Sequence, residues 1–251
     1  MKLLMCPPLY YRSGAEERQR ALSQWRGLYR LLQDQLAVDV DLLEPRPDVP
    51  SLVHVGTGGF LAGGTLVADC LADGSGTPES EPLENFFLVR GYHIEHLHMH
   101  AGFEGNRNFL AWGDTLFAGL HAGNLSGGQG EIEAIVDTEV VGLEIANGWP
   151  GPLATGLCLL GEGEALFCPT AFTDAARAKL EARIPRLVAV DEKKGSAAMG
   201  NALIVGRDVI VPQNHSVVVP TLESQGLTVH ECPLEEFSEE GGPRTLVLQL
   251  E

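Results

Sequence analysis

Residues 140–172 read VVGLEIANGWPGPLATGLCLLGEGEALFCPTAF, and this stretch contains most of one structural unit. The GEGE segment at 161–164 predicts a turn between two apolar runs. The amphipathic run that follows predicts a helix over Thr173–Ile184, with Asp174 as its cap. Strands are expected at the apolar segments Val140–Ile145, Leu153–Leu160, Ala165–Cys168 and Arg186–Val190. The unit is therefore two or three short strands and one helix.

The same alternation extends in both directions from this unit. Ala15–Leu36 has apolar residues at helical spacing, Leu52–Val55 reads as a strand, and FLAWGDTLFAG (109–119) predicts a hairpin. The unit recurs about five times at roughly fifty residues, which favours a radial repeat. No linker interrupts the pattern, so residues 1–251 are expected to form one α/β domain.

Composition and charge exclude several classes of protein. Apolar residues make up 44% of the 251, and no uncharged apolar run approaches the ~18 residues of a membrane span. The net charge of −17 argues against nucleic acid and against anionic membrane surfaces as partners. The five cysteines are scattered and odd in number, which predicts reduced thiols and a cytoplasmic location.

Several segments in a fixed order resemble the dimethylarginine dimethylaminohydrolase and amidinotransferase family, the guanidine-modifying penteins. They are MCPPLYY at the N-terminus, Gln24-Trp25, Phe103-Glu104-Gly105, Leu116-Phe117-Ala118-Gly119, the stretch from Val141 to Phe172, Gly200-Asn201-Ala202, and Glu240-Gly241-Gly242-Pro243-Arg244. The resemblance implies a five-bladed α/β propeller of repeated ββαβ-type units, with the active site in a central channel.

That family uses a cysteine thiolate to attack the guanidinium carbon, a histidine to move protons, and carboxylates to bind the cation. The resemblance places Thr245 at the cysteine position and Pro152 at the histidine position. It also places Ala154 where the family has an aspartate two residues after that histidine.

The residues expected to bind the guanidinium are also changed. Ser51 takes the place of an aspartate after Pro50, and Arg107-Asn108 replace a Gly-Asp pair. Glu104 is retained from the acidic and catalytic set, either as a functional acid or as an acceptor for backbone N–H groups. Ser51 and Asn108 remove negative charge that a buried cation needs, and Arg107 would add repulsion if it faced the channel.

These substitutions predict a catalytically inactive relative that binds a small molecule or a protein partner near the old channel. No cofactor is expected, and a homodimer is one assembly that the sequence leaves open. A first alternative is a hydrolase or amidinotransferase acting on an arginine-type guanidino compound through a relocated nucleophile. Cys158, Cys168 and Cys232 are the thiols to consider for that role.

A second alternative is metal-dependent activity at the histidine cluster His93–His100. His96, His98 and His100 would share one face of a strand. At about 3.3 Å per residue, the backbones of His96 and His100 lie roughly 13 Å apart, which is too far for both to bind one metal. The simpler interpretation is a polar strand face whose opposite side packs through Leu97 and Met99.

Overall fold

The protein is described by a computed structural model that covers residues 1–68, 77–97, 105–121, 125–161, 163–191, 202–213, 218–238 and 241–250. Its strands are β1 (Lys2–Met5), β2 (Asp39–Leu42), β3 (Gly59–Ala62), β4 (Thr65–Ala68), β5 (His93–His96), β6 (Phe109–Trp112), β7 (Thr115–Leu120), β8 (Glu139–Glu144), β9 (Leu157–Gly161), β10 (Glu164–Phe167), β11 (Arg186–Ala189), β12 (Leu203–Val205), β13 (Asp208–Pro212), β14 (Thr228–Cys232) and β15 (Leu248–Gln249).

The described helices fall into two groups by length and position. The helices that connect strands are α1 (Ala15–Arg30), α2 (Ser80–Leu88), α4 (Leu125–Ile135), α6 (Asp174–Arg183) and α8 (Val219–Ser224). The four-residue helices are α3 (Gly105–Asn108), α5 (Leu153–Gly156) and α9 (Gly242–Thr245). A π-helical turn η1 (Leu31–Gln35) extends α1, and 3-10 turns occupy η2 (Pro50–Val53), η3 (Pro169–Ala171) and η4 (Glu235–Phe237).

The strands form five three-stranded sheets with the same internal order. In β6-β7-β8, for example, β6 and β7 pair antiparallel as a hairpin, and β7 and β8 pair parallel. A parallel pair needs a crossover connection, and α4 supplies it between β7 and β8. The first sheet has the order β15-β1-β2, so the last strand of the chain pairs antiparallel with the first. The expected ββαβ repeat is confirmed.

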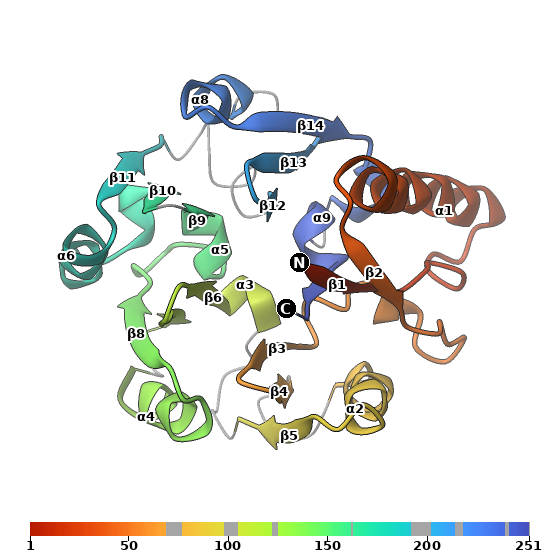
Figure 1. The fold of residues 1–251 in the computed structure, drawn as a ribbon, viewed down its shortest axis with the longest axis horizontal. Helices are drawn as coiled ribbons and strands as arrows, with labels where there is room; N and C mark the ends of the chain where they lie inside the picture. Colours follow the sequence, from red (N-terminus) through yellow and green to blue (C-terminus); the bar gives the residue numbers. More distant parts are fainter. Residues whose placement is uncertain are drawn as a thin grey trace.

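The sheets are arranged around a common centre, with one long helix on the outer side of each sheet (Figure 1). The short helices α3, α5 and α9 lie near the centre, as do both ends of the chain (Figure 1). Helix α3 contacts both α5 and α9. Each short helix directly precedes an innermost strand, so the residues of these helices are the ones that the fold brings together.

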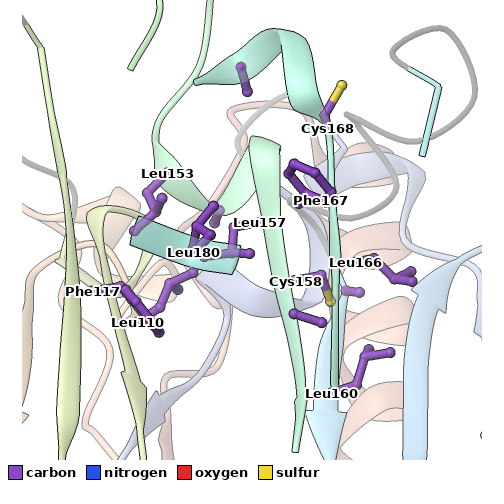
Figure 2. Packing of buried hydrophobic residues seen from close by; sticks show 14 of the residues in the cluster. Leu110, Phe117, Leu153, Leu157, Cys158, Leu160, Leu166, Phe167, Cys168 and Leu180 are labelled. Carbon is purple, nitrogen blue, oxygen red and sulfur yellow. The ribbon is translucent and has the colours of Figure 1, made fainter. Parts of the chain in front are cut away.

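Apolar side chains fill the space between neighbouring sheets and their helices. In the largest cluster, Phe117 of β7 packs with Leu110, Leu153, Leu157 and Leu180, all nearly or fully buried (Figure 2). Cys158 and Cys168 belong to the same cluster as small apolar side chains. The core is therefore shared between adjacent sheets, which holds the sheets at fixed positions around the centre.

Three local expectations from the sequence differ from the structure. Leu52–Val55 was expected as a strand, but its first residues belong to the 3-10 turn η2. The expected strand over Leu153–Leu160 begins as helix α5 and becomes β9 at Leu157. The cap of α6 is Thr173, whose hydroxyl accepts from the backbone N–H of Ala176. Short apolar runs do not distinguish a strand from a helical turn, which explains the first two differences.

Replacing Phe117 by Ala should lower the free energy of unfolding by about 3–5 kcal/mol, because the change leaves a cavity in a fully buried cluster. Val89 is 81% exposed, so Val89→Ala is a matched control that should change stability by less than about 0.5 kcal/mol. Urea denaturation of both variants measures the difference. A loss below 1 kcal/mol for Phe117→Ala would contradict the described core.

Candidate functional site

Gly56 brings three central segments into contact. Its N–H donates to the carbonyl of Thr245 (2.9 Å), and its own carbonyl accepts from the N–H of Asn106 (3.0 Å). The Asn106 side-chain amide donates to the carbonyls of Arg244 (3.3 Å) and Val247 (3.0 Å). A Cβ on Gly56 would lie 2.3 Å from the oxygen of Val247, so only glycine fits between the turn after η2 and the α9 segment.

His54 and Thr245 form a buried pair beside this junction. Nδ1 of His54 lies 3.0 Å from Oγ1 of Thr245, and that hydroxyl donates to the carbonyl of Gly242 at 3.1 Å. A hydroxyl has one proton, so His54 carries its own proton on Nδ1 and donates it to Thr245. Thr245 is 0% exposed and His54 is 6% exposed. Both side chains are therefore shielded from solvent.

The environment of His54 keeps its ring neutral. Burial, together with the charges of Arg12 and Arg107, lowers the pKa of His54 to about 4 against the opposing effect of Glu79. The ring is in edge contact with Tyr11 at 5.3 Å between centroids. Its Nε2 is buried and has no hydrogen-bond partner within the described residues.

Arginine side chains gather around the pair. A Cβ built on Gly241 would lie 2.8 Å from Cγ2 of Thr245 and 3.4 Å from Nε of Arg107, so the guanidinium of Arg107 lies next to Thr245. Arg244 donates from Nε to the carbonyl of Asn106 (3.0 Å). Burial lowers the pKa of Arg244, and the neighbouring charge of Arg107 lowers it as well. Among the described residues, two arginines thus lie at the centre of a chain with a net charge of −17, and the charge of Glu79 also acts on His54.

The residues expected at the catalytic histidine and aspartate positions have structural roles. Pro152 is the N-cap of α5, and its carbonyl accepts the hydroxyl of Thr155 (2.7 Å). That hydroxyl in turn accepts from Nε1 of Trp149 (2.8 Å). Ala154 is fully buried in the apolar cluster of Phe117. Neither Pro152 nor Ala154 can transfer a proton.

The residues expected to bind a guanidinium have different surroundings in the structure. Ser51 is exposed in η2 and its hydroxyl donates to Glu79, whose charge acts on His54. Arg107 and Asn108 both lie in α3, where Asn108 is 8% exposed and its Oδ1 has no partner within the described part of the chain. Glu104 lies outside the described residues.

The histidine cluster is described in part. His96 ends β5, is largely exposed, and its Nε2 lies 3.7 Å from Oε1 of Glu84. His98 and His100 lie outside the described residues. Within the described ranges, no three His, Cys, Asp or Glu side chains come together as metal ligands.

The four described thiols are all buried. Burial raises the pKa of Cys6 to about 12, and that of Cys158 and of Cys232 to about 11. A thiol acts as a nucleophile through its thiolate, so these raised pKa values suppress reactivity near neutral pH. Cys168 is buried beside the Thr170 hydroxyl at 3.4 Å.

Sequence reasoning missed the roles of His54 and Arg244. Arg244 entered only as the end of a segment that carries the resemblance, and His54 is 191 residues from its partner Thr245. A usable signal was present for His54, since a lone polar ring within the apolar run LVHV (52–55) must find a buried partner.

Comparison with known proteins agrees with this geometry. No protein-family model matches the sequence. The chain is 27% identical to the bifunctional arginine dihydrolase/ornithine cyclodeaminase AgrE of Nostoc sp., over 96% of this chain and 36% of that protein. It is 27% identical to N(G),N(G)-dimethylarginine dimethylaminohydrolase of Mycobacterium tuberculosis, over 89% of this chain and 73% of that protein.

A solved structure of an arginine dihydrolase is similar to the chain over its whole length. The N-terminal domain of ArgZ, an arginine dihydrolase from the ornithine–ammonia cycle in cyanobacteria solved with its product, matches with a TM-score of 0.85 and 26% identity. The match covers 100% of this chain and 97% of that one. The chain has the pentein fold. The resemblance drawn from the sequence is confirmed, and the pentein relatives are hydrolases of arginine-type compounds.

No helix in the described part of this pentein is long and apolar enough to cross a membrane.

Replacing Gly56 by Ala should lower the free energy of unfolding by about 1–3 kcal/mol or more, because the added Cβ displaces the backbone of the Arg244–Val247 segment. Gly27 of α1 provides the matched control. A Cβ there meets nothing within 4 Å, so Gly27→Ala should stabilise the pentein by about 0.5–1 kcal/mol. Equal effects of the two variants in thermal unfolding would contradict the central junction.

The buried neutral His54 predicts a pH dependence of stability. The unfolded chain binds a proton at His54 below about pH 6.5, whereas the folded protein does so only below about pH 4. The free energy of unfolding should therefore fall as pH decreases between these values, by up to about 1.4 kcal/mol per unit from this group. His54→Gln, which does not titrate, should show a shallower slope in urea denaturation at each pH. Identical slopes would show that His54 titrates normally.

Proposed function

We propose that this pentein is a non-catalytic relative of the guanidine hydrolases that binds a small molecule in its central channel. The observation that carries the proposal is the state of Thr245, the residue at the position of the family nucleophile. It is fully buried, and its hydroxyl proton is directed to the carbonyl of Gly242. The proposal takes residues 1–251 as one domain, because β1 and β15 pair in the same sheet.

The electrostatics of the centre support the proposal. A guanidinium substrate beside Thr245 would meet the guanidinium of Arg107, and Arg244 of the same short helix α9 carries a second positive charge. Like charges at such short range in a buried site are strongly unfavourable. The side chain of Arg107 therefore takes a position that an arginine-type substrate would need.

The thiol chemistry also supports it. A relocated nucleophile requires an accessible thiolate, but the described cysteines are buried and burial raises the pKa of Cys6, Cys158 and Cys232. Cys70 lies outside the described residues.

One observation favours a second candidate function, hydrolysis of a guanidino compound through a threonine nucleophile. The contact between Nδ1 of His54 and Oγ1 of Thr245 has the length expected of a base next to a nucleophile, and the ring would take the tautomer that leaves Nδ1 unprotonated. The pKa of His54, lowered to about 4, makes it a weak base toward a hydroxyl, so the non-catalytic function is the better supported.

Turnover separates the two candidates. The purified protein is incubated with L-arginine, methylated arginines and agmatine, and ureido product and released amine are assayed, with AgrE as the positive control. We expect no product above the protein-free rate, because the described part of the chain offers neither an accessible thiolate nor a strong base beside Thr245. Product formation that Thr245→Ala abolishes would establish the threonine mechanism, whereas loss in a cysteine variant would establish a relocated thiol.

A further inference from the structure

The structure contains a cavity of about 450 Å³ at the centre, lined mainly by the innermost strands. Most of its described lining is apolar, from β3, β6, β9, β12 and the chain ends: Met1, Leu3, Phe60, Leu61, Phe109, Leu110, Ala111, Trp112, Leu116, Leu159, Leu160, Leu203, Ile204, Val247, Leu248 and Leu250. The remaining described lining residues are Asn106, Gly113, Gly161, Gly206, Gln249 and Arg244. The volume falls within the roughly 300–1,000 Å³ typical of small-molecule sites.

Arg244 supplies the charged side chain of this described lining. The Arg244 backbone is fixed by the Asn106 side chain, and its Nε donates to the Asn106 carbonyl. Within the described chain no carboxylate forms an ion pair with Arg244, although Arg20, Arg46, Arg177, Arg183 and Arg186 all have such partners. Arg244 thus differs from the surface arginines in having no described compensating charge.

An arginine remains protonated even where burial lowers its pKa, since its ordinary value is above about 12. A guanidinium in an apolar enclosure without a counter-charge is unfavourable, and an anion that reaches it relieves that cost. A carboxylate suits this role, because it can accept two parallel hydrogen bonds from one guanidinium. The apolar walls would then take up an apolar body attached to that carboxylate.

We propose that the cavity binds a monocarboxylate with an apolar body, with its carboxylate on the guanidinium of Arg244. The inference rests on the proposed function, in which the channel holds a ligand without converting it. It also specifies the charge of the ligand: an ammonium or guanidinium compound would be repelled by Arg244. The carboxylate of the proposed ligand is negatively charged, whereas the guanidino groups on which the relatives act are positively charged.

Binding is measured by calorimetry with straight-chain carboxylates from acetate to decanoate and with phenylalkanoates, below their micelle concentrations. The alcohol and the amine of each body are the controls. We expect the affinity of the carboxylates to rise by about fourfold per added methylene until the cavity is full, because each methylene leaves water. The alcohols should bind at least about tenfold more weakly and the amines not at all. Trp112 lines the cavity, so its fluorescence should change on binding, and Trp112→Phe should remove that signal.

Three variants test the assignment of Arg244. Arg244→Gln should weaken carboxylate binding about tenfold or more while leaving alcohol binding unchanged, and Arg244→Lys should retain part of the carboxylate preference. Arg183→Gln is the matched control. Arg183 lies at the end of α6 and forms an ion pair with Glu139, so the change removes one positive charge outside the cavity and binding should not change. Ile204→Trp fills the cavity from a half-buried position and should abolish binding of both classes.

The outcomes separate this inference from the proposed function. Equal affinity for a carboxylate and its alcohol, or wild-type carboxylate affinity in both Arg244→Gln and Ile204→Trp, would overturn the inference. If Arg244→Gln does not fold, Arg244→Lys and Ile204→Trp carry the same comparison. Turnover of a guanidino compound would overturn the proposed function, whereas absence of both turnover and carboxylate binding would overturn the carboxylate site alone.

Discussion

The centre of the protein depends on the backbone hydrogen bonds of Gly56. This glycine links the turn after η2 to the C-terminal segment through the carbonyl of Thr245, and to α3 through the N–H of Asn106. Gly56 and Thr245 lie 189 positions apart in sequence (245 − 56), and β15 adds a second link by pairing with β1. Because these contacts are made by backbone atoms and by one amide side chain, they hold the central residues in position whatever charge those residues carry. The side chains at the centre can therefore change without any change in fold.

The charges described at the centre contrast with the overall composition. The chain has 34 acidic and 17 basic residues. Among the described residues, Arg107 belongs to α3, which contacts α9, and Arg244 lies within α9; their charges act on each other, and that of Arg107 also acts on His54. Composition describes the solvated surface, where acidic residues promote solubility. It says little about a site that contains a few residues. In a buried environment those few charges dominate, because the effective dielectric constant is lower and water does not screen them.

The repeating architecture was predictable from the sequence, but the pairing of central residues was not. The hairpin at 109–119 and the strand–helix alternation after Val140 follow local patterns, and the structure has them as β6-β7 and as β8 to β11. The η2 turn was not predicted, since LVHV has the composition of a strand. The contact between His54 and Thr245 joins residues far apart in sequence, so no local pattern encodes it. The resemblance did indicate a loss of charge at Ser51 and Asn108 and of the nucleophile at Thr245. Each of these predictions concerns one residue and needs no knowledge of which residues are in contact.

The burial of His54 and Thr245 agrees with the proposed non-catalytic function. A catalytic nucleophile must face a substrate, so its surroundings have to leave a space that water can enter when the substrate is absent. Thr245 has no such space: its hydroxyl bonds to His54 and Gly242, and its methyl group lies against Gly241, next to Arg107. The unpartnered Nε2 of His54 carries a cost of about 1–3 kcal/mol, which the close packing of Tyr11 and Phe237 around the ring offsets. Such a closed arrangement stabilises the centre around Thr245. The cavity described above lies next to Arg244, so the segment after Gly241 is packed at Thr245 and borders an open space at Arg244.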